Sequence, residues 1–177
     1  MGKIKTGYIQ IYTGNGKGKT TAAIGLALRA AGHGMRICLI QFMKNYPYGE
    51  IKSLDKYKHL ITLHRFGNDD FVFKKQPPSH EDLNFARQGL DFAEDCLTSK
   101  KYDIVILDEI CVSTYFKIVQ LNDVLSLISK KPDNVELILT GRYCPDELIE
   151  KADLVTEMKE IKHYYNSGVL ARKGIES

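Results

Sequence analysis

Three glycines and two lysines are concentrated in the stretch TGNGKGKTT, which runs from Thr13 to Thr21. Glycine allows backbone N–H groups to turn inward at torsion angles that a Cβ would resist, and such a turn before a helix forms an anion nest. Lys19 adds a mobile cation for phosphate oxygens, and the Thr20 hydroxyl is a suitable ligand for Mg²⁺. The stretch therefore predicts a phosphate-binding loop (P-loop); the alternative is a plain glycine-rich turn between a strand and a helix.

This loop differs from the usual P-loop pattern G-x-x-x-x-G-K-[ST] in one respect. The pattern has glycine where Thr13 stands, and counted from Gly14 the loop is one residue shorter. The phosphate-binding chemistry is therefore expected, but the geometry of a P-loop hydrolase is not.

Charged side chains follow two further apolar runs of the sequence. Asp108 and Glu109 end YDIVILDEI, and Arg142 follows VELILTG. Ligands of parallel sheets bind at the carboxyl ends of the strands, where an acidic residue reaches the Mg²⁺ shell and an arginine spreads phosphate charge. We expect these residues to complete a nucleotide site, although carboxylates that end a strand in solvent and an exposed surface arginine are the simpler alternatives.

Apolar runs of strand length alternate with helix-length segments, which predicts βαβ units and a parallel sheet with helices on both faces. The expected strands are residues 7–13, 35–42, 60–66, 102–110 and 135–141. A helix is expected over residues 19–31, ended by glycines, and a short one within residues 49–58. After Ser79, with Asp82 three positions on, a longer amphipathic helix is expected to bury a face made of Leu83, Ala86, Leu90, Ala93 and Leu97.

Composition limits the class of protein. The 177 residues predict one globular domain, residues 1–177, and the 44% apolar and 27% charged fractions are ordinary for a chain that folds alone. The net charge of +3 provides no large field for nucleic acid. The four cysteines lack zinc-type spacing, and no stretch has the length of a membrane span, so a cytoplasmic protein with reduced thiols is expected.

Several motifs, in their order along the chain, resemble the P-loop type of ATP:corrinoid adenosyltransferase. They are GNGKGKTT, QFMK followed by Gly49-Glu50, LDE, LTGR, ADLVTEM, KH and GIE, which together extend to Glu176. The resemblance implies a RecA-like P-loop fold, of the α/β class with a mostly parallel central sheet. It also implies transfer of the 5′-deoxyadenosyl group of ATP to the cobalt of a reduced corrinoid, release of triphosphate, and a nucleotide held in the reverse sense from ordinary P-loop hydrolases.

The same resemblance implies roles for individual residues and partners. Lys19, Glu109 and Arg142 would be catalytic, while Thr20, Asp108 and Glu109 would hold Mg²⁺ or Mn²⁺. Phe71 and Phe73 would lie near the corrin, in the place of a Phe-x-Trp pair. An electron donor such as a flavoprotein and a homodimer are also implied. The loop residues that would bind ATP are Gly14, Asn15, Gly16, Lys17, Gly18, Lys19, Thr20 and Thr21.

The chain departs from the pattern of this family at both ends. Only a dozen residues precede the loop, so a segment that closes the site from the N-terminal side in longer members is expected to be lacking. In the tail, Tyr164 and Arg172 stand where members commonly have proline and glutamine.

The expected reaction needs little from the protein besides position and charge. Cobalt(I) is itself the nucleophile, so the chain has to align C5′ of ATP and neutralise the departing triphosphate. The alternative is an ATPase or nucleotide switch in which Glu109 orients a hydrolytic water. A guanine-type switch would need N-K-x-D after a strand, a nucleoside kinase with a zinc-held lasso would need paired cysteines, and a nucleic-acid clamp would need more positive charge.

Overall fold

The computed structural model describes residues 4–44, 48–67 and 77–176. Its centre is a six-stranded sheet in the order β3-β2-β4-β5-β1-β6, and every pair of neighbouring strands is parallel. The parallel sheet of the predicted α/β class is therefore confirmed. The strands are β1 (Ile9–Thr13), β2 (Ile37–Phe42), β3 (Ile61–Phe66), β4 (Ile104–Asp108), β5 (Glu136–Thr140) and β6 (Leu154–Glu157).

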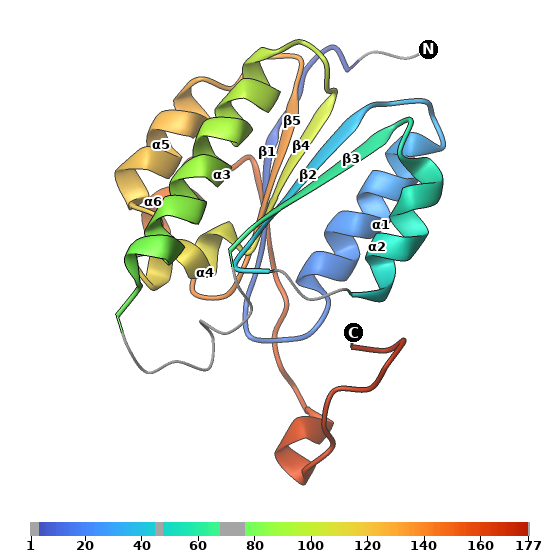
Figure 1. The fold of residues 1–177 in the computed structure, drawn as a ribbon, viewed down its shortest axis with the longest axis vertical. Helices are drawn as coiled ribbons and strands as arrows, with labels where there is room; N and C mark the ends of the chain where they lie inside the picture. Colours follow the sequence, from blue (N-terminus) through green and yellow to red (C-terminus); the bar gives the residue numbers. More distant parts are fainter. Residues whose placement is uncertain (1–3, 45–47, 68–76, 177) are drawn as a thin grey trace.

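Helices cover both faces of this sheet (Figure 1). One face carries α1 (Lys19–Ala31) and α2 (Gly49–Leu54), the latter continued by the 3₁₀ turn η1 (Asp55–Tyr57). On the opposite face lie α3 (His80–Thr98), α4 (Ile110–Tyr115), α5 (Leu121–Ser129) and α6 (Asp146–Ile149). After β6 the chain continues past the carboxyl edge of the sheet as a tail that contains the 3₁₀ turn η3 (Tyr164–Ser167).

The predicted elements agree with these bounds where the sequence pattern is long and regular. The helix expected over residues 19–31 is α1, and each of the five expected strands is present, although all five are shorter than predicted. The short helices α4 and α6, helix α5 and edge strand β6 were not expected. Short segments carry too few periods for hydrophobic spacing to distinguish their type.

Two apolar layers hold the helices to the sheet. On one side, the buried face of α1 is built from Ala23, Ala27, Ala30 and Ala31, which pack with alternate residues of the central strands. On the other side, α3 begins with the expected capping box, in which the Ser79 side chain accepts a hydrogen bond from the Asp82 amide. The α3 face is confirmed except at Leu83, which remains 38% exposed.

Two glycines in helices lead to opposite predictions. At Gly89 of α3, an added Cβ would lie 2.7 Å from Phe42 Cε1 and 3.2 Å from Phe66 Cγ, whereas nothing lies within 4 Å of one added at Gly25 of α1. We expect Gly25→Ala to raise the free energy of unfolding by about 0.5–1 kcal/mol, because alanine is the better helix former. We expect Gly89→Ala to lower it by about 1–3 kcal/mol, because the core around Phe42 is overpacked. Urea unfolding measures both, and equal shifts in the two proteins would contradict the packing argument.

Within the described ranges, the structure contains no helix that combines the length and the apolar character needed to cross a membrane.

Candidate active site

The P-loop connects β1 to α1, and its glycines are required by its geometry. Gly14 and Gly18 have φ values of +95° and +120°, which are unfavourable for residues with a Cβ. An added Cβ would also lie 2.5 Å from the Met158 carbonyl oxygen at Gly14 and 2.6 Å from it at Gly16. The loop is therefore enclosed on one side by the segment that follows β6.

One loop amide is already paired within the protein. The Gly16 N–H donates to the Met158 carbonyl at 2.6 Å, so it faces the segment after β6 instead of an anion. Of the other loop residues, Asn15, Lys17 and Thr21 have exposed side chains around the loop. The expectation that successive loop amides turn inward thus has one structural exception.

Lys19 is held at the centre of the loop. Its Nζ donates to the carbonyl oxygens of Gly14 and Gly16, at 2.8 and 2.7 Å, and the residue is only 7% exposed. Burial, followed by the charge of nearby Arg142, lowers the pKa of Lys19. In this structure the two loop carbonyls therefore accept the hydrogen bonds that the Lys19 ammonium would otherwise donate to phosphate oxygens.

Asp108, at the end of β4, is a buried acceptor of four hydrogen bonds. Its Oδ1 receives the hydroxyls of Thr20 and Thr140, at 2.8 and 2.7 Å. Its Oδ2 receives Lys44 Nζ at 2.7 Å and Gln41 Nε2 at 3.1 Å. Burial acts to raise the pKa of Asp108, but the Lys44 charge and these hydrogen bonds outweigh it, so the pKa lies below its ordinary value. Asp108 is therefore an ionised anchor for the residues around it.

The P-loop follows β1 and the acidic residues follow β4, but these two strands are not neighbours in the sheet. β5 lies between β1 and β4, and α1 crosses all three on its way over the sheet. This crossing brings Thr20, in the first turn of α1, to Asp108. Thr140, at the end of β5, occupies the intermediate position and bonds to the same carboxylate.

Glu109 occupies a left-handed backbone conformation, with φ +64°, immediately before α4. Its N–H donates to Thr140 Oγ1 at 3.0 Å, and its side chain is 23% exposed. Burial and the charge of Asp108 raise the pKa of Glu109. Such strained residues are enriched at functional sites, and here the strain accompanies a carboxylate that reaches the solvent-accessible side of the site.

Arg142 lies close to the other two residues that were predicted to be catalytic. It follows Gly141, whose φ of +140° turns the chain at the end of β5, and its side chain is exposed. Its charge lowers the pKa values of both Lys19 and Glu109. Lys19, Glu109 and Arg142 thus converge at the carboxyl edge of the sheet, as the sequence pattern predicts.

A cleft of about 640 Å³ opens beside these residues, on the α1 and α2 side of the carboxyl edge. This volume is in the range of small-molecule sites. Its lining combines the start of α1, the start of α2, the acidic end of β4 and the end of the tail: Thr20, Thr21, Ile24, Lys44, Tyr48, Gly49, Glu50, Ser53, Glu109, Gly174, Ile175 and Glu176.

The tail is attached to the P-loop through Glu176. Lys17 Nζ lies 2.8 Å from Glu176 Oε1 and also donates to the Ile175 carbonyl at 3.2 Å. Arg172 pairs with the same carboxylate at 3.1 Å and stacks over the Tyr164 ring, whose hydroxyl also bonds to Glu176. The hydrogen bonds from Arg172, Lys17 and Tyr164 hold the pKa of Glu176 well below its ordinary value. The two tail residues that depart from the family pattern therefore help to place the tail over the cleft.

The oxygen atoms at the site suit a hard divalent cation bound together with a nucleotide. No group of three or more His, Cys, Asp or Glu side chains in the described part of the chain is arranged to hold a metal. Mg²⁺ commonly uses one or two protein oxygens and retains several waters. Glu109 and Thr20 supply such oxygens, and the fully buried Gln41 Oε1 has no partner and can accept from a water. The residues present therefore fit Mg²⁺.

Comparison with known proteins identifies the family. The family model described as ATP:corrinoid adenosyltransferase BtuR/CobO/CobP matches residues 5–177. The chain belongs to this family. The corrinoid adenosyltransferase of Escherichia coli K12 is 34% identical over 171 residues, which are 96% of this chain and 85% of the relative. That of Salmonella typhimurium LT2 is 33% identical with the same coverage.

A solved structure supports the fold. A KaiC-like protein from Pyrococcus horikoshii OT3 superimposes with a TM-score of 0.58 and 21% identity, over 89% of this chain and 75% of that chain. At this identity the likeness shows the fold alone, and it confirms the RecA-like P-loop class expected for an adenosyltransferase of this family.

Three polar residues of the adenosyltransferase site were not assigned a role from the sequence. Lys44 belongs to the QFMK motif of the family and Thr140 to its LTGR motif, but neither was singled out. Gln41 is also part of QFMK, and its position at the end of an otherwise apolar strand was an available signal. All three side chains contact Asp108.

The residues predicted to contact the corrin, Phe71 and Phe73, lie outside the described residues of this adenosyltransferase. Their role stays a prediction. The described chain resumes at Pro77, shortly before α3.

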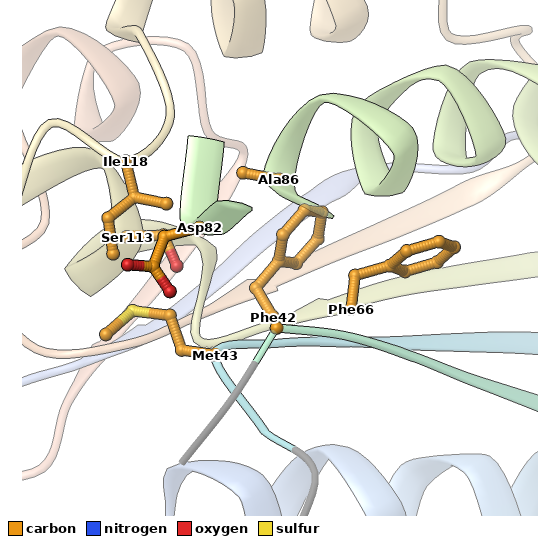
Figure 2. A pocket seen from close by; sticks show the side chains of 8 residues that line it. Phe42, Met43, Phe66, Asp82, Ala86, Ser113 and Ile118 are labelled. Atoms are coloured by element: carbon orange, nitrogen blue, oxygen red, sulfur yellow. The ribbon is translucent and has the colours of Figure 1, made fainter. Parts of the chain in front are cut away.

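A second cavity lies on the other face of the sheet, beneath the start of α3. Figure 2 shows the side chains of Phe42, Phe66 and Ala86 around it, with Asp82 at its rim. Its volume is about 10 Å³, which is enough for about one water molecule. The Asp82 carboxylate is used in the cap of α3, where Ser79 donates to it. This cavity is too small for either substrate of an adenosyltransferase.

Proposed function

We propose that this protein transfers the 5′-deoxyadenosyl group of ATP to the cobalt(I) of a corrinoid and releases triphosphate. The observation that carries the proposal is the arrangement of Lys19, Thr20 and Glu109 at the mouth of a ligand-sized cleft, in a chain of this family. A cationic loop and a hard-oxygen site are what a departing triphosphate requires.

The reaction is a displacement at C5′ of ATP. The electron pair of cobalt(I) forms the bond to C5′, and the C5′–O bond breaks with its electron pair moving to the triphosphate. Negative charge therefore grows on the leaving group, where Lys19 and Arg142 act. Lys19 exchanges its two loop carbonyls for phosphate oxygens, so the charged group is already in place before the reaction.

Mg²⁺ or Mn²⁺ would be held by Thr20 and Glu109, and when bound would supply further positive charge to the triphosphate. Asp108 orients this arrangement because it accepts a hydrogen bond from the Thr20 hydroxyl and so leaves a lone pair of Thr20 Oγ1 for the metal. Its oxygens also accept from Gln41 and Thr140, so it acts as a support for the ligands.

The remaining parts of the proposal concern partners and place. Cobalt must be reduced before it attacks, so an electron donor such as a flavoprotein is proposed, and Phe71 and Phe73 are proposed to contact the corrin. We also propose that the protein forms a homodimer and lies in the cytoplasm.

The alternative function is ATP hydrolysis. It is favoured by one observation, the raised pKa of the partly exposed Glu109 carboxylate, since a general base works best with a pKa near the operating pH. In that reaction Glu109 would orient a water toward the γ-phosphate.

The products distinguish the two functions. Protein mixed with Mg-ATP and chemically reduced cobalamin is expected to yield an adenosylated corrinoid and intact triphosphate in equal amounts. Chromatography of the phosphates and the absorption spectrum of the corrinoid measure both products. Release of orthophosphate at a comparable rate without any corrinoid would instead establish the hydrolase.

A further inference from the structure

Lys44 is a buried cation at the centre of the acidic site, and the mechanism described above does not use it. Its side chain is 15% exposed. Nζ lies 2.7 Å from Asp108 Oδ2, 3.2 Å from Thr20 Oγ1 and 3.9 Å from Glu109 Oε1. The ammonium is therefore surrounded by one hydroxyl and two carboxylates, which come from α1 and from the end of β4.

These same oxygens are the ones that suit a divalent cation. A metal bound to Thr20 and Glu109 would lie within a few ångströms of Lys44 Nζ as it is placed in the structure. Two cations at such a separation repel strongly in a partly buried site. The ammonium in its present position and a metal on these ligands therefore compete for the same oxygens.

The chain around Lys44 allows the ammonium to move toward the nucleotide. Lys44 lines the cleft, and lysine carries its charge on a flexible stem of four carbons. It follows Met43, whose φ of +56° turns the chain away from β2 at the carboxyl edge. A Lys44 side chain displaced from Asp108 into the cleft would enter the space beside Thr20 and Thr21. These residues lie at the start of α1, and a helix N-terminus is a favourable site for phosphate.

We propose that Lys44 occupies the place of the divalent metal in the nucleotide-free protein and, when the metal–nucleotide complex binds, moves to the triphosphate as a second cation beside Lys19. Lys44 would then compensate Asp108 and Glu109 before the metal arrives and would contact the triphosphate afterwards. The proposal rests on the proposed function only in taking a nucleoside triphosphate as the ligand.

The two halves of this proposal predict effects of opposite sign in Lys44→Met, which removes the charge and keeps the length of the side chain. Without nucleotide, Mn²⁺ should bind on the order of tenfold more tightly than to the unchanged protein, because its competitor is gone. With the β,γ-imido analogue of ATP and Mg²⁺, the nucleotide should bind on the order of tenfold more weakly, because a phosphate contact is lost. Electron paramagnetic resonance of free Mn²⁺ and calorimetry with the analogue measure the two affinities.

The matched control is Lys52→Met, which removes an exposed lysine of α2 outside the cleft lining and should change neither affinity. Lys44→Arg keeps the charge and should leave Mn²⁺ binding as weak as in the unchanged protein. Mn²⁺ affinity that is equal or lower in Lys44→Met would overturn the proposal, and so would analogue binding that is equal or tighter.

The test remains decisive if Lys44→Met does not fold. Lys44→Gln, which removes the charge and keeps a polar group beside Asp108 and Thr20, should then show the same pair of effects, tighter Mn²⁺ binding without nucleotide and weaker binding of the analogue, and the absence of either effect would overturn the proposal. All these measurements are made without a corrinoid and with an analogue that resists γ-phosphate cleavage. A failure of the proposed adenosyl transfer would therefore appear in the product analysis and not here.

Discussion

Lys19→Ala is expected to lose about 100- to 1,000-fold or more of the transfer rate while the protein keeps its fold. The ammonium of Lys19 is held within the loop by two carbonyls and exchanges them for phosphate oxygens when the triphosphate binds, so it is in place before the C5′–O bond breaks. Its removal leaves the developing charge of the leaving group without the nearest cation. The fold should survive because the two carbonyls that lose a partner belong to a loop and take no part in the hydrogen bonds of the sheet or of α1.

The transfer rate from chemically reduced cobalamin measures this effect, and circular dichroism with urea unfolding measures the fold. Arg29→Ala is the matched control, because it removes an exposed cation from the last turn of the same helix, away from the loop. A folded Lys19→Ala protein with nearly normal transfer would show that this loop is not the triphosphate site.

Asp108→Ala is expected to have the largest effect on stability, lowering the free energy of unfolding by about 3–5 kcal/mol at neutral pH. Four donors converge on this buried carboxylate, and one of them is the Lys44 ammonium. The substitution leaves that charge buried without its partner. Adding Lys44→Met to Asp108→Ala should recover part of the loss, because the unpaired ammonium is then absent.

The effect of Asp108 should depend on pH in a definite direction. Because the pKa of Asp108 is lower in the folded protein than in the unfolded chain, its stabilising contribution is complete above the unfolded value of about 3.9. It is lost as the pH falls through the folded value. The difference in free energy of unfolding between the unchanged protein and Asp108→Ala should therefore be constant near neutrality and shrink in strongly acidic solution. Urea titrations across this range measure it, and a difference that grows on acidification would contradict the ion pair.

The local features of the site could be predicted from the sequence because each depends on a few adjacent residues. Gly14 and Gly18 adopt torsion angles that glycine favours, and Lys19 opens the helix that the alanine spacing predicts. Asp108 ends an apolar run that could only be a buried strand in this setting. The family motifs extended the prediction to the reaction, since their order covers nearly the whole chain.

Only the tertiary structure decided which of these pieces meet. The strand order places β2 beside β4, which brings Lys44 and Gln41 to Asp108 from more than sixty positions away in the chain. It also inserts β5 between β1 and β4, so that the P-loop reaches the acid through α1 and Thr140.

The same holds for the tail, where Arg172 and Tyr164 meet Lys17 through Glu176. Local sequence determines torsion angles and hydrophobic spacing, because these depend on neighbours within a turn or a strand. The pairing of distant strands and the docking of the tail depend instead on how apolar faces are buried together, which no short stretch of the sequence specifies.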